Sequence, residues 1–154
     1  TLFYDYLGND ALKKPTPLNF FKKFNVEEDG EHKGKFDVKT RALMPLIDGA
    51  RLLVMSNNIR GINNTYLRFK QLAMVDVKNS ELFLTCADAF ITVSRIRTIE
   101  GLKNDSIGQY VVLDELTKSD KEKLKNALQP LKDLEELIKI HTKYPVDCMV
   151  LVHQ

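Results

Sequence analysis

The chain has 154 residues, of which 44% are hydrophobic and 29% charged, a composition typical of one soluble globular domain with its own core. Its net charge of +2 comes from interspersed basic and acidic residues and argues against a nucleic-acid-binding protein, which needs a clustered basic stripe. No run approaches the roughly 18 apolar residues of a membrane span, and the widely spaced Cys86 and Cys148 favour a reducing, cytoplasmic compartment over a disulfide framework.

The first 23 residues are expected to be a lead-in segment to a single domain that spans residues 24–154. Pro15 and Pro17 force an extended path there, because each removes a backbone donor and restricts the preceding residue. The sequence has neither an initiator methionine nor a signal peptide at its start, so we expect it to begin inside a longer polypeptide.

A short β-hairpin is predicted next. Residues 24–26 and 35–38 alternate between apolar and polar side chains, as strands with one buried face do, and Asp29-Gly30 between them is a typical turn dipeptide. Gly34 weakens the second arm, so the predicted pairing is short.

From Ala42 the spacing of apolar residues changes to the helical period. A first helix is predicted to stop at Asn57-Asn58, with Pro45 in its first turn, where a missing N–H matters least. A second helix is predicted to begin near residues 63–65, and a third after Ser80. The expected buried line of the third helix consists of Leu82, Cys86, Ala89, Val93 and Ile96.

Residues 104–116 are predicted to form a loop, and the last helix is predicted to follow it with a capping box. In this box Ser119 and Glu122 would each satisfy a free backbone donor. Apolar residues between Leu124 and His141, at steps of three and four, predict a bundle seam that Pro130 should bend. The sequence thus predicts a mainly α fold, an antiparallel four-helix-type bundle with a short N-terminal β-hairpin.

Catalytic motifs are absent from the sequence. Nucleotidyl transfer needs paired carboxylates that hold Mg²⁺ against a triphosphate, commonly Asp-x-Asp after a Gly-Ser turn, and the chain has neither motif. It has no glycine-rich phosphate loop, and its three histidines, His32, His141 and His153, are not gathered at metal-ligand spacing. We therefore expect no complete catalytic site, no metal site and no cofactor bound by this chain alone.

Several charged residues lie on or beside the predicted apolar helix lines. A charge next to a buried stripe costs free energy unless it is paired. Two interpretations stay open for Asp48, Arg51, Arg95, Arg97 and Glu100. One is a structural network, for instance Asp48 with Arg97 and Arg51 with Glu100. The other is a small anion-binding face, in which arginines hold phosphate or carboxylate.

Lys39, at the predicted strand-to-helix junction, and Arg68 would extend such a face, although each alone is more often a solvated side chain. His141 on the bundle seam is expected to be a packed core histidine, and Cys86 a small apolar core residue.

Two segments, residues 36–53 and 61–69, resemble the putative nucleotidyltransferase substrate-binding domain family. The similarity in order and spacing extends over nearly the whole chain. The later segments that resemble the family are Arg95-x-Arg97, residues 114–116 and residues 125–131.

In that family the domain follows a nucleotidyltransferase domain, often behind paired CBS domains and sometimes a cyclic-nucleotide-binding module, in bacterial-type signalling proteins. The resemblance implies a helical domain that packs against the nucleotidyltransferase core and helps to hold the nucleotide or its acceptor. Mg²⁺ and a nucleoside triphosphate would then belong to the upstream catalytic domain. The substrate-binding residues that the resemblance implies are Lys39, Asp48, Arg51, Arg68, Arg95 and Arg97.

A second hypothesis is a regulatory or dimerisation bundle without small-molecule binding, which predicts a large exposed apolar patch. The substrate-binding hypothesis predicts instead that Asp48 and Arg51 open onto one cleft together with Arg95 and Arg97. The expected partners are the upstream domains of the same polypeptide and, under the second hypothesis, a second copy of the chain, with neither nucleic acid nor membrane.

Overall fold

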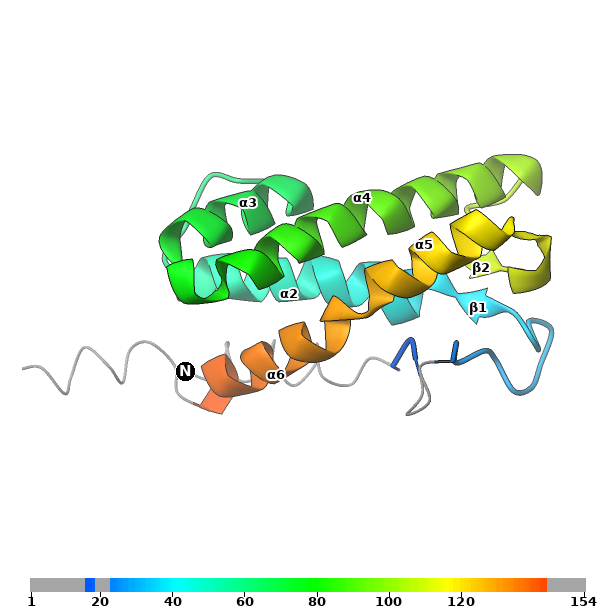
Figure 1. The fold of residues 1–154 in the computed structure, drawn as a ribbon, viewed down its shortest axis with the longest axis horizontal. Helices are drawn as coiled ribbons and strands as arrows, with labels where there is room; N and C mark the ends of the chain where they lie inside the picture. The colour runs from blue at the N-terminus through cyan, green and yellow to red at the C-terminus, as the bar shows by residue number, and fades with distance from the viewer. Residues whose placement is uncertain (1–15, 19–22, 144–154) are drawn as a thin grey trace, which may run out of the picture.

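The computed structural model of the protein describes residues 16–18 and 23–143, and helices dominate this part of the chain (Figure 1). Most of the predicted lead-in segment lies outside the described residues, as do Cys148 and His153. The mainly α fold with a small antiparallel sheet is confirmed. In chain order the elements are β1 (Phe36–Asp37), the π-helix η1 (Lys39–Leu43), α2 (Met44–Ser56), α3 (Thr65–Val75), the 3₁₀ turn η2 (Val77–Asn79), α4 (Ser80–Lys103), β2 (Tyr110–Val111), the 3₁₀ turn η3 (Leu113–Glu115), α5 (Lys118–Leu128) and α6 (Pro130–Lys143).

The first helical segment starts earlier than predicted, because the π-helix η1 precedes α2. The N–H of Met44 donates to the carbonyl of Lys39, five residues back, which widens this turn. Pro45 follows at once in the first turn of α2, as predicted, although η1 places six helical residues before it. At the other end Asn58 has a φ of 57°, so an asparagine in the left-handed region terminates α2 as expected.

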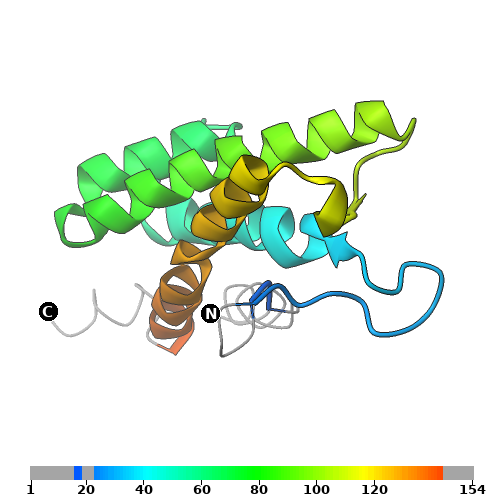
Figure 2. The ribbon, with the colours of Figure 1, turned by 45° about the vertical axis from the view of Figure 1, so that its right-hand side comes forward.

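Helices α3 and α4 form a helical hairpin and pack along each other (Figures 1 and 2). Asn64 caps α3 by accepting a hydrogen bond from the N–H of Leu67 at 3.0 Å, so the start predicted at residues 63–65 is confirmed. Phe69 and Phe83 face each other across the hairpin with ring centroids 6.4 Å apart. The predicted line of α4 is buried from Cys86 to Ile96.

The predicted last helix is two helices, α5 and α6, that separate at Gln129. Pro130 is the first residue of α6, since its ring and missing N–H do not allow the α5 ladder to continue through it. Helix α5 packs on α4, and α6 packs on α2 and α4 (Figure 2). The cap of α5 is Thr117, which accepts from the N–H of Asp120 at 3.0 Å, so the capping box predicted at Ser119 is wrong by two residues.

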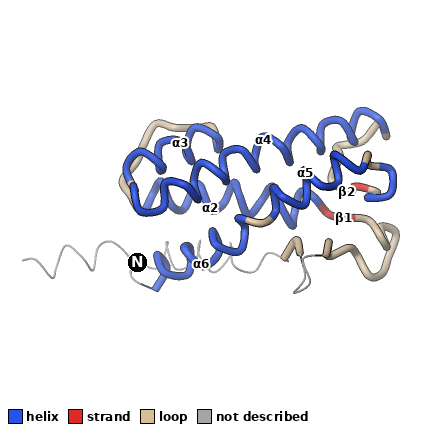
Figure 3. Tube along the Cα trace, in the orientation of Figure 1, coloured by secondary structure: helices blue, strands red, loops and turns tan. Residues whose placement is uncertain are grey.

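The predicted hairpin partner of residues 35–38 is also wrong. β1 pairs antiparallel with β2, which lies in the segment predicted as a loop (Figure 3). In this pairing Phe36 stands opposite Val111. The turn around Gly30 exists, because the N–H of Glu27 donates to the carbonyl of Lys35 at 3.0 Å, but residues 24–26 form no strand. Burial of both Phe36 and Val111 explains the pairing, since it places the sheet against the core.

The core lies between the helical hairpin, α2 and the α5–α6 pair. The largest fully buried side chains are Phe36, Phe69, Phe83, Leu46, Leu53, Leu72, Leu124, Leu128 and Leu134, together with Glu100.

No described helix is both long and apolar enough to cross a membrane.

Candidate anion-binding site

Lys39 is the first residue of η1, and one residue, Val38, separates it from the end of β1. Its position is fixed by the strand on one side and by the π turn on the other, a local geometry that is often found at functional sites. The side chain is half-buried and forms no ion pair with any described residue. Its ammonium group is therefore a positive charge without a carboxylate partner in the described part of the chain.

Arg97 lies two turns from the end of α4 and is held by the loop that follows the helix. Its Nε donates to the carbonyl of Ile107 at 3.0 Å. Gly108 packs directly against the backbone of Arg97, and its N–H donates to Oγ of Ser106 at 3.1 Å. Because Nε is already engaged, the direction of the guanidinium plane is set, while its two terminal nitrogens form no ion pair with a described residue.

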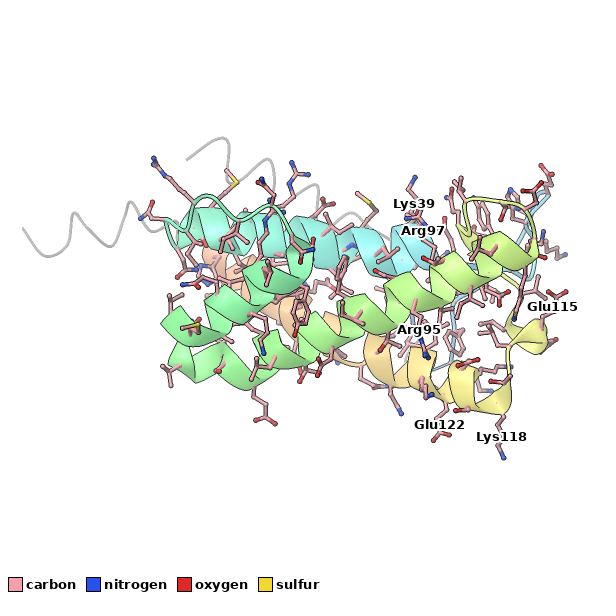
Figure 4. All side chains as sticks on the ribbon, turned by 90° about the horizontal axis from the view of Figure 1, so that it is seen from above. Lys39, Arg95, Arg97, Glu115, Lys118 and Glu122 are labelled. Carbon is pink, nitrogen blue, oxygen red and sulfur yellow. The ribbon has the colours of Figure 1, made fainter. Side chains whose placement is uncertain are left out.

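Figure 4 shows Lys39 and Arg97 on the same side of α4, and η1 packs against that helix. Neither cation forms an ion pair with a described carboxylate, so neither charge is neutralised within the described residues before an anion binds. A lysine offers a point charge and an arginine offers a planar fork of donors, and together these groups suit a phosphate. This pair, Lys39 with Arg97, is the anion-binding pair discussed below.

Arg95 points to the other side of α4, toward α5 (Figure 4). Its guanidinium lies 3.7 Å from the carboxylate of Asp120, and its side chain is 53% exposed. Two residues along a helix correspond to a rotation of about 200°, so Arg95 and Arg97 face opposite directions. They therefore do not line one shared cleft.

Asp48 and Arg51 lie on the outer line of α2, together with Met44 and Met55. Arg51 is exposed and Asp48 is half-buried, so neither is embedded in the apolar interior. Glu100, by contrast, is buried at 2% exposure, and it pairs with Lys103 at 3.1 Å instead of with Arg51. Glu100 therefore does not form the pair with Arg51 that the sequence suggested.

Arg68 has a local structural contact. Its Nε donates to the carbonyl of Ile62 at 2.7 Å, a bond that ties the connection between α2 and α3 to the first turns of α3. The side chain is half-buried. Arg68, like Arg97, thus has its Nε engaged by the carbonyl of an adjacent loop.

The family model described as putative nucleotidyltransferase substrate binding domain matches residues 1–142. The chain belongs to this family. Searches of curated proteins and of solved structures found no match. The matched range includes all six candidate residues and every described element except the last residue of α6.

Sequence reasoning missed one residue that organises this end of the family domain, Asp37. Its side chain is 7% exposed; Oδ1 accepts from the N–H of Thr40 at 2.9 Å, and Oδ2 accepts from Nε2 of Gln109 at 3.3 Å. Asp37 thus caps the helical run that begins at η1 and joins it to the segment before β2. An aspartate just before a helical period is a capping signal, so the pattern could have revealed it.

A second missed group surrounds the turn at Gly30. Arg41 pairs with Glu27 at 3.3 Å and also donates to the carbonyl of Thr16 at 3.0 Å. The ring of His32 stacks on Tyr110 at a centroid distance of 3.7 Å. Burial, with the negative charges of Asp37 and Glu27 adding to it, raises the pKa of Tyr110. These contacts hold the turn onto β2.

Metal chemistry has no support in the described residues of this family domain, where no group of three His, Cys, Asp or Glu side chains gathers in metal-binding geometry. The donors that an Mg²⁺ ion requires, several carboxylate or carbonyl oxygens around one point, are therefore not assembled in this part of the chain. The chemistry that these residues offer to a ligand is cationic.

Proposed function

We propose that this chain is a non-catalytic helical substrate-binding domain of a larger nucleotidyltransferase signalling protein, and that Lys39 and Arg97 hold a phosphate group of the nucleotide or its acceptor. The observation that carries the proposal is the anion-binding pair itself: two cations from different elements lie on one side of α4 and have no carboxylate partner among the described residues. Family membership supports the same role.

The contact that Arg97 makes within the chain supports this proposal. The bond from Arg97 to the carbonyl of Ile107 orients the guanidinium before a ligand arrives, so less side-chain entropy is lost on binding. Arg51 lies twelve residues beyond Lys39 on the same helical run, about 18 Å away at the usual rise of a helix. One phosphate cannot contact both residues, and Arg51 with Asp48 would contact a different part of an extended ligand.

The reacting groups would come from elsewhere in the same polypeptide. Paired carboxylates, Mg²⁺ and the nucleoside triphosphate belong in this proposal to an upstream nucleotidyltransferase domain, accompanied by CBS-type regulatory domains. The present domain would hold one end of the substrate, and holding a reactant in place accelerates a two-substrate transfer by making the encounter effectively intramolecular.

Calorimetric titration of the chain with ATP, GTP and inorganic triphosphate at low salt tests the proposal. Lys39→Gln and Arg97→Gln should each weaken binding about 10- to 150-fold, because a hydrogen bond to a charged group contributes about 1.5–3 kcal/mol. Lys118→Gln, which removes a positive charge from the exposed face of α5 (Figure 4), is the matched control and should leave the affinity unchanged. Absence of binding by all three ligands, or equal binding by all variants, would overturn the proposal.

Arg97→Lys separates charge from geometry. Lysine keeps the positive charge but lacks the planar fork, so we expect an affinity between that of the wild type and that of Arg97→Gln. Circular dichroism of each variant establishes that the helices remain intact.

A further inference from the structure

The outer face of α4 is exposed along its whole length. Exposed residues recur there at steps of three and four, the spacing of a coiled-coil seam. We name these residues the outer stripe of α4. They are Glu81, Leu84, Asp88, Ile91, Arg95, Thr98, Ile99 and Leu102.

Half of the stripe residues are apolar, and no described element covers them. Leu84 and Ile99 are each 40% exposed, Ile91 is 50% exposed and Leu102 is 80% exposed. Helices α3 and α5 pack on α4 from its two flanks, and among the described elements none lies over the stripe in the view of Figure 4. A row of aliphatic residues at this spacing on the longest helix is the pattern of a helix-packing surface.

Charge along the stripe is divided between its two halves. Glu81 and Asp88 make the first half acidic, whereas the charged residue of the second half is the basic Arg95. A parallel copy of the stripe would place like charges opposite each other. An antiparallel copy would place the acidic half of each stripe on the basic half of the other, and would also oppose the two helix dipoles favourably.

We infer that the outer stripe of α4 binds the same stripe of a second copy of this chain in antiparallel orientation. A two-fold axis next to Ile91 sets Asp88 opposite Arg95 of the partner subunit and Leu84 opposite Ile99 of the partner subunit. Each contact then occurs twice, which is the property of a closed two-fold interface. The two Ile91 side chains meet at the axis and form the apolar centre.

The dimer leaves the anion-binding pair uncovered, because Arg97 faces the opposite side of α4 from the stripe. The inference therefore does not rest on the proposed function. Within one chain, the pair of Arg95 with Asp120 is long at 3.7 Å and exposed, so it competes little for the guanidinium.

The expected association is weak. A helix of 24 residues is about 36 Å long, and contact along one helix pair gives an interface at the small end of stable complexes. We expect the chain to be mostly monomeric at about 1 μM and mostly dimeric at about 100 μM. Sedimentation equilibrium of the full 154-residue chain over this concentration range measures the fraction of dimer.

Charge reversal tests the stripe and its orientation together. Asp88→Arg makes both central charges positive and Arg95→Asp makes both negative, so each variant alone should remain monomeric at about 100 μM. An equimolar mixture of the two variants should form heterodimers, and the double variant D88R/R95D should dimerise again, because both restore opposite charges across the axis.

Two exposed residues of α5 provide controls of matching charge change. Glu122→Lys changes the charge as Asp88→Arg does, and Lys118→Glu changes it as Arg95→Asp does; both lie outside the stripe (Figure 4). These controls should dimerise as the wild type does. A wild-type chain that stays monomeric at all concentrations overturns the inference. So does a dimer that both single charge reversals leave intact, or a variant mixture that stays monomeric.

Discussion

Gly108 lies against the backbone of Arg97 so closely that a Cβ atom on residue 108 would overlap the Arg97 carbonyl oxygen. Its φ of 69° is also in the left-handed region that favours glycine. The contact brings the loop after α4 back onto the helix, where the carbonyl of Ile107 receives the Nε of Arg97. The orientation of a candidate binding residue thus depends on a glycine eleven positions further along the chain.

Gly108→Ala should therefore destabilise the protein strongly. The added methyl group meets backbone, which cannot move aside as a side chain can, and the left-handed conformation adds strain of its own. We expect a loss of about 3 kcal/mol in the free energy of unfolding, measured by urea denaturation followed by circular dichroism.

Gly34→Ala is the control that isolates the contact from the strain. Gly34 has a φ of 79°, but a Cβ atom there meets nothing within 4 Å. Its substitution should cost only the conformational strain, about 1 kcal/mol. Equal losses for the two variants would show that the contact with Arg97 contributes nothing.

The cap of α5 gives a second prediction. Thr117 accepts from the N–H of Asp120 and donates to its carboxylate at 2.9 Å, whereas Ser119 lies inside the helix and is exposed. Thr117→Ala should lower the free energy of unfolding by about 1 kcal/mol, and Ser119→Ala should change it by a few tenths at most. The same denaturation experiment compares the two. A larger loss for Ser119→Ala than for Thr117→Ala would place the start of α5 where the sequence pattern predicted it.

The helices were predictable because each has a continuous apolar line and a local boundary signal. Asn64 caps α3, Asn58 ends α2, and Pro130 marks the break between α5 and α6. These signals act within a few residues of sequence. The start of α5 was less predictable, because Ser119 and Thr117 offer competing caps only two residues apart, and helix ends are defined no more sharply than that.

The strand pairing could not be predicted in the same way. Phe36 pairs with Val111, a contact between residues far apart in sequence that depends on how α4 returns the chain. Residues 24–26 have the right alternation, but alternation does not specify a partner. The site shows the same limit: the sequence indicated that Arg95 and Arg97 lie on one helix, and only the neighbouring elements determine that α5 engages the first and the Ile107 loop the second.

Cys86 should be inert in the native protein. The thiol is fully buried, and burial, with the negative charge of Asp133 adding to it, raises its pKa to about 12. At pH 8 only about one thiol in 10⁴ is then the reactive thiolate. In a Cys148→Ser variant, a thiol reagent should modify Cys86 only as the protein unfolds, with a rate that rises in urea. Rapid modification in native buffer would contradict the buried position.

His141 should make stability depend on pH below neutrality. Burial lowers its pKa from 6.5, and the opposing effect of Asp76 is smaller. Between pH 6.5 and the lower pKa of His141 in the native protein, the imidazole of the unfolded chain binds a proton and that of the native protein does not. The contribution of His141 to the free energy of unfolding should therefore be complete above pH 6.5 and fall as the pH falls through this window. His141→Gln lacks this titration. The free energies of unfolding of wild type and variant, measured in urea at pH 7.5 and again below pH 6.5, give the comparison. At the lower pH the wild type should lose stability relative to the variant. A difference that is constant across the window would mean that the imidazole has the same pKa in the folded and unfolded chain.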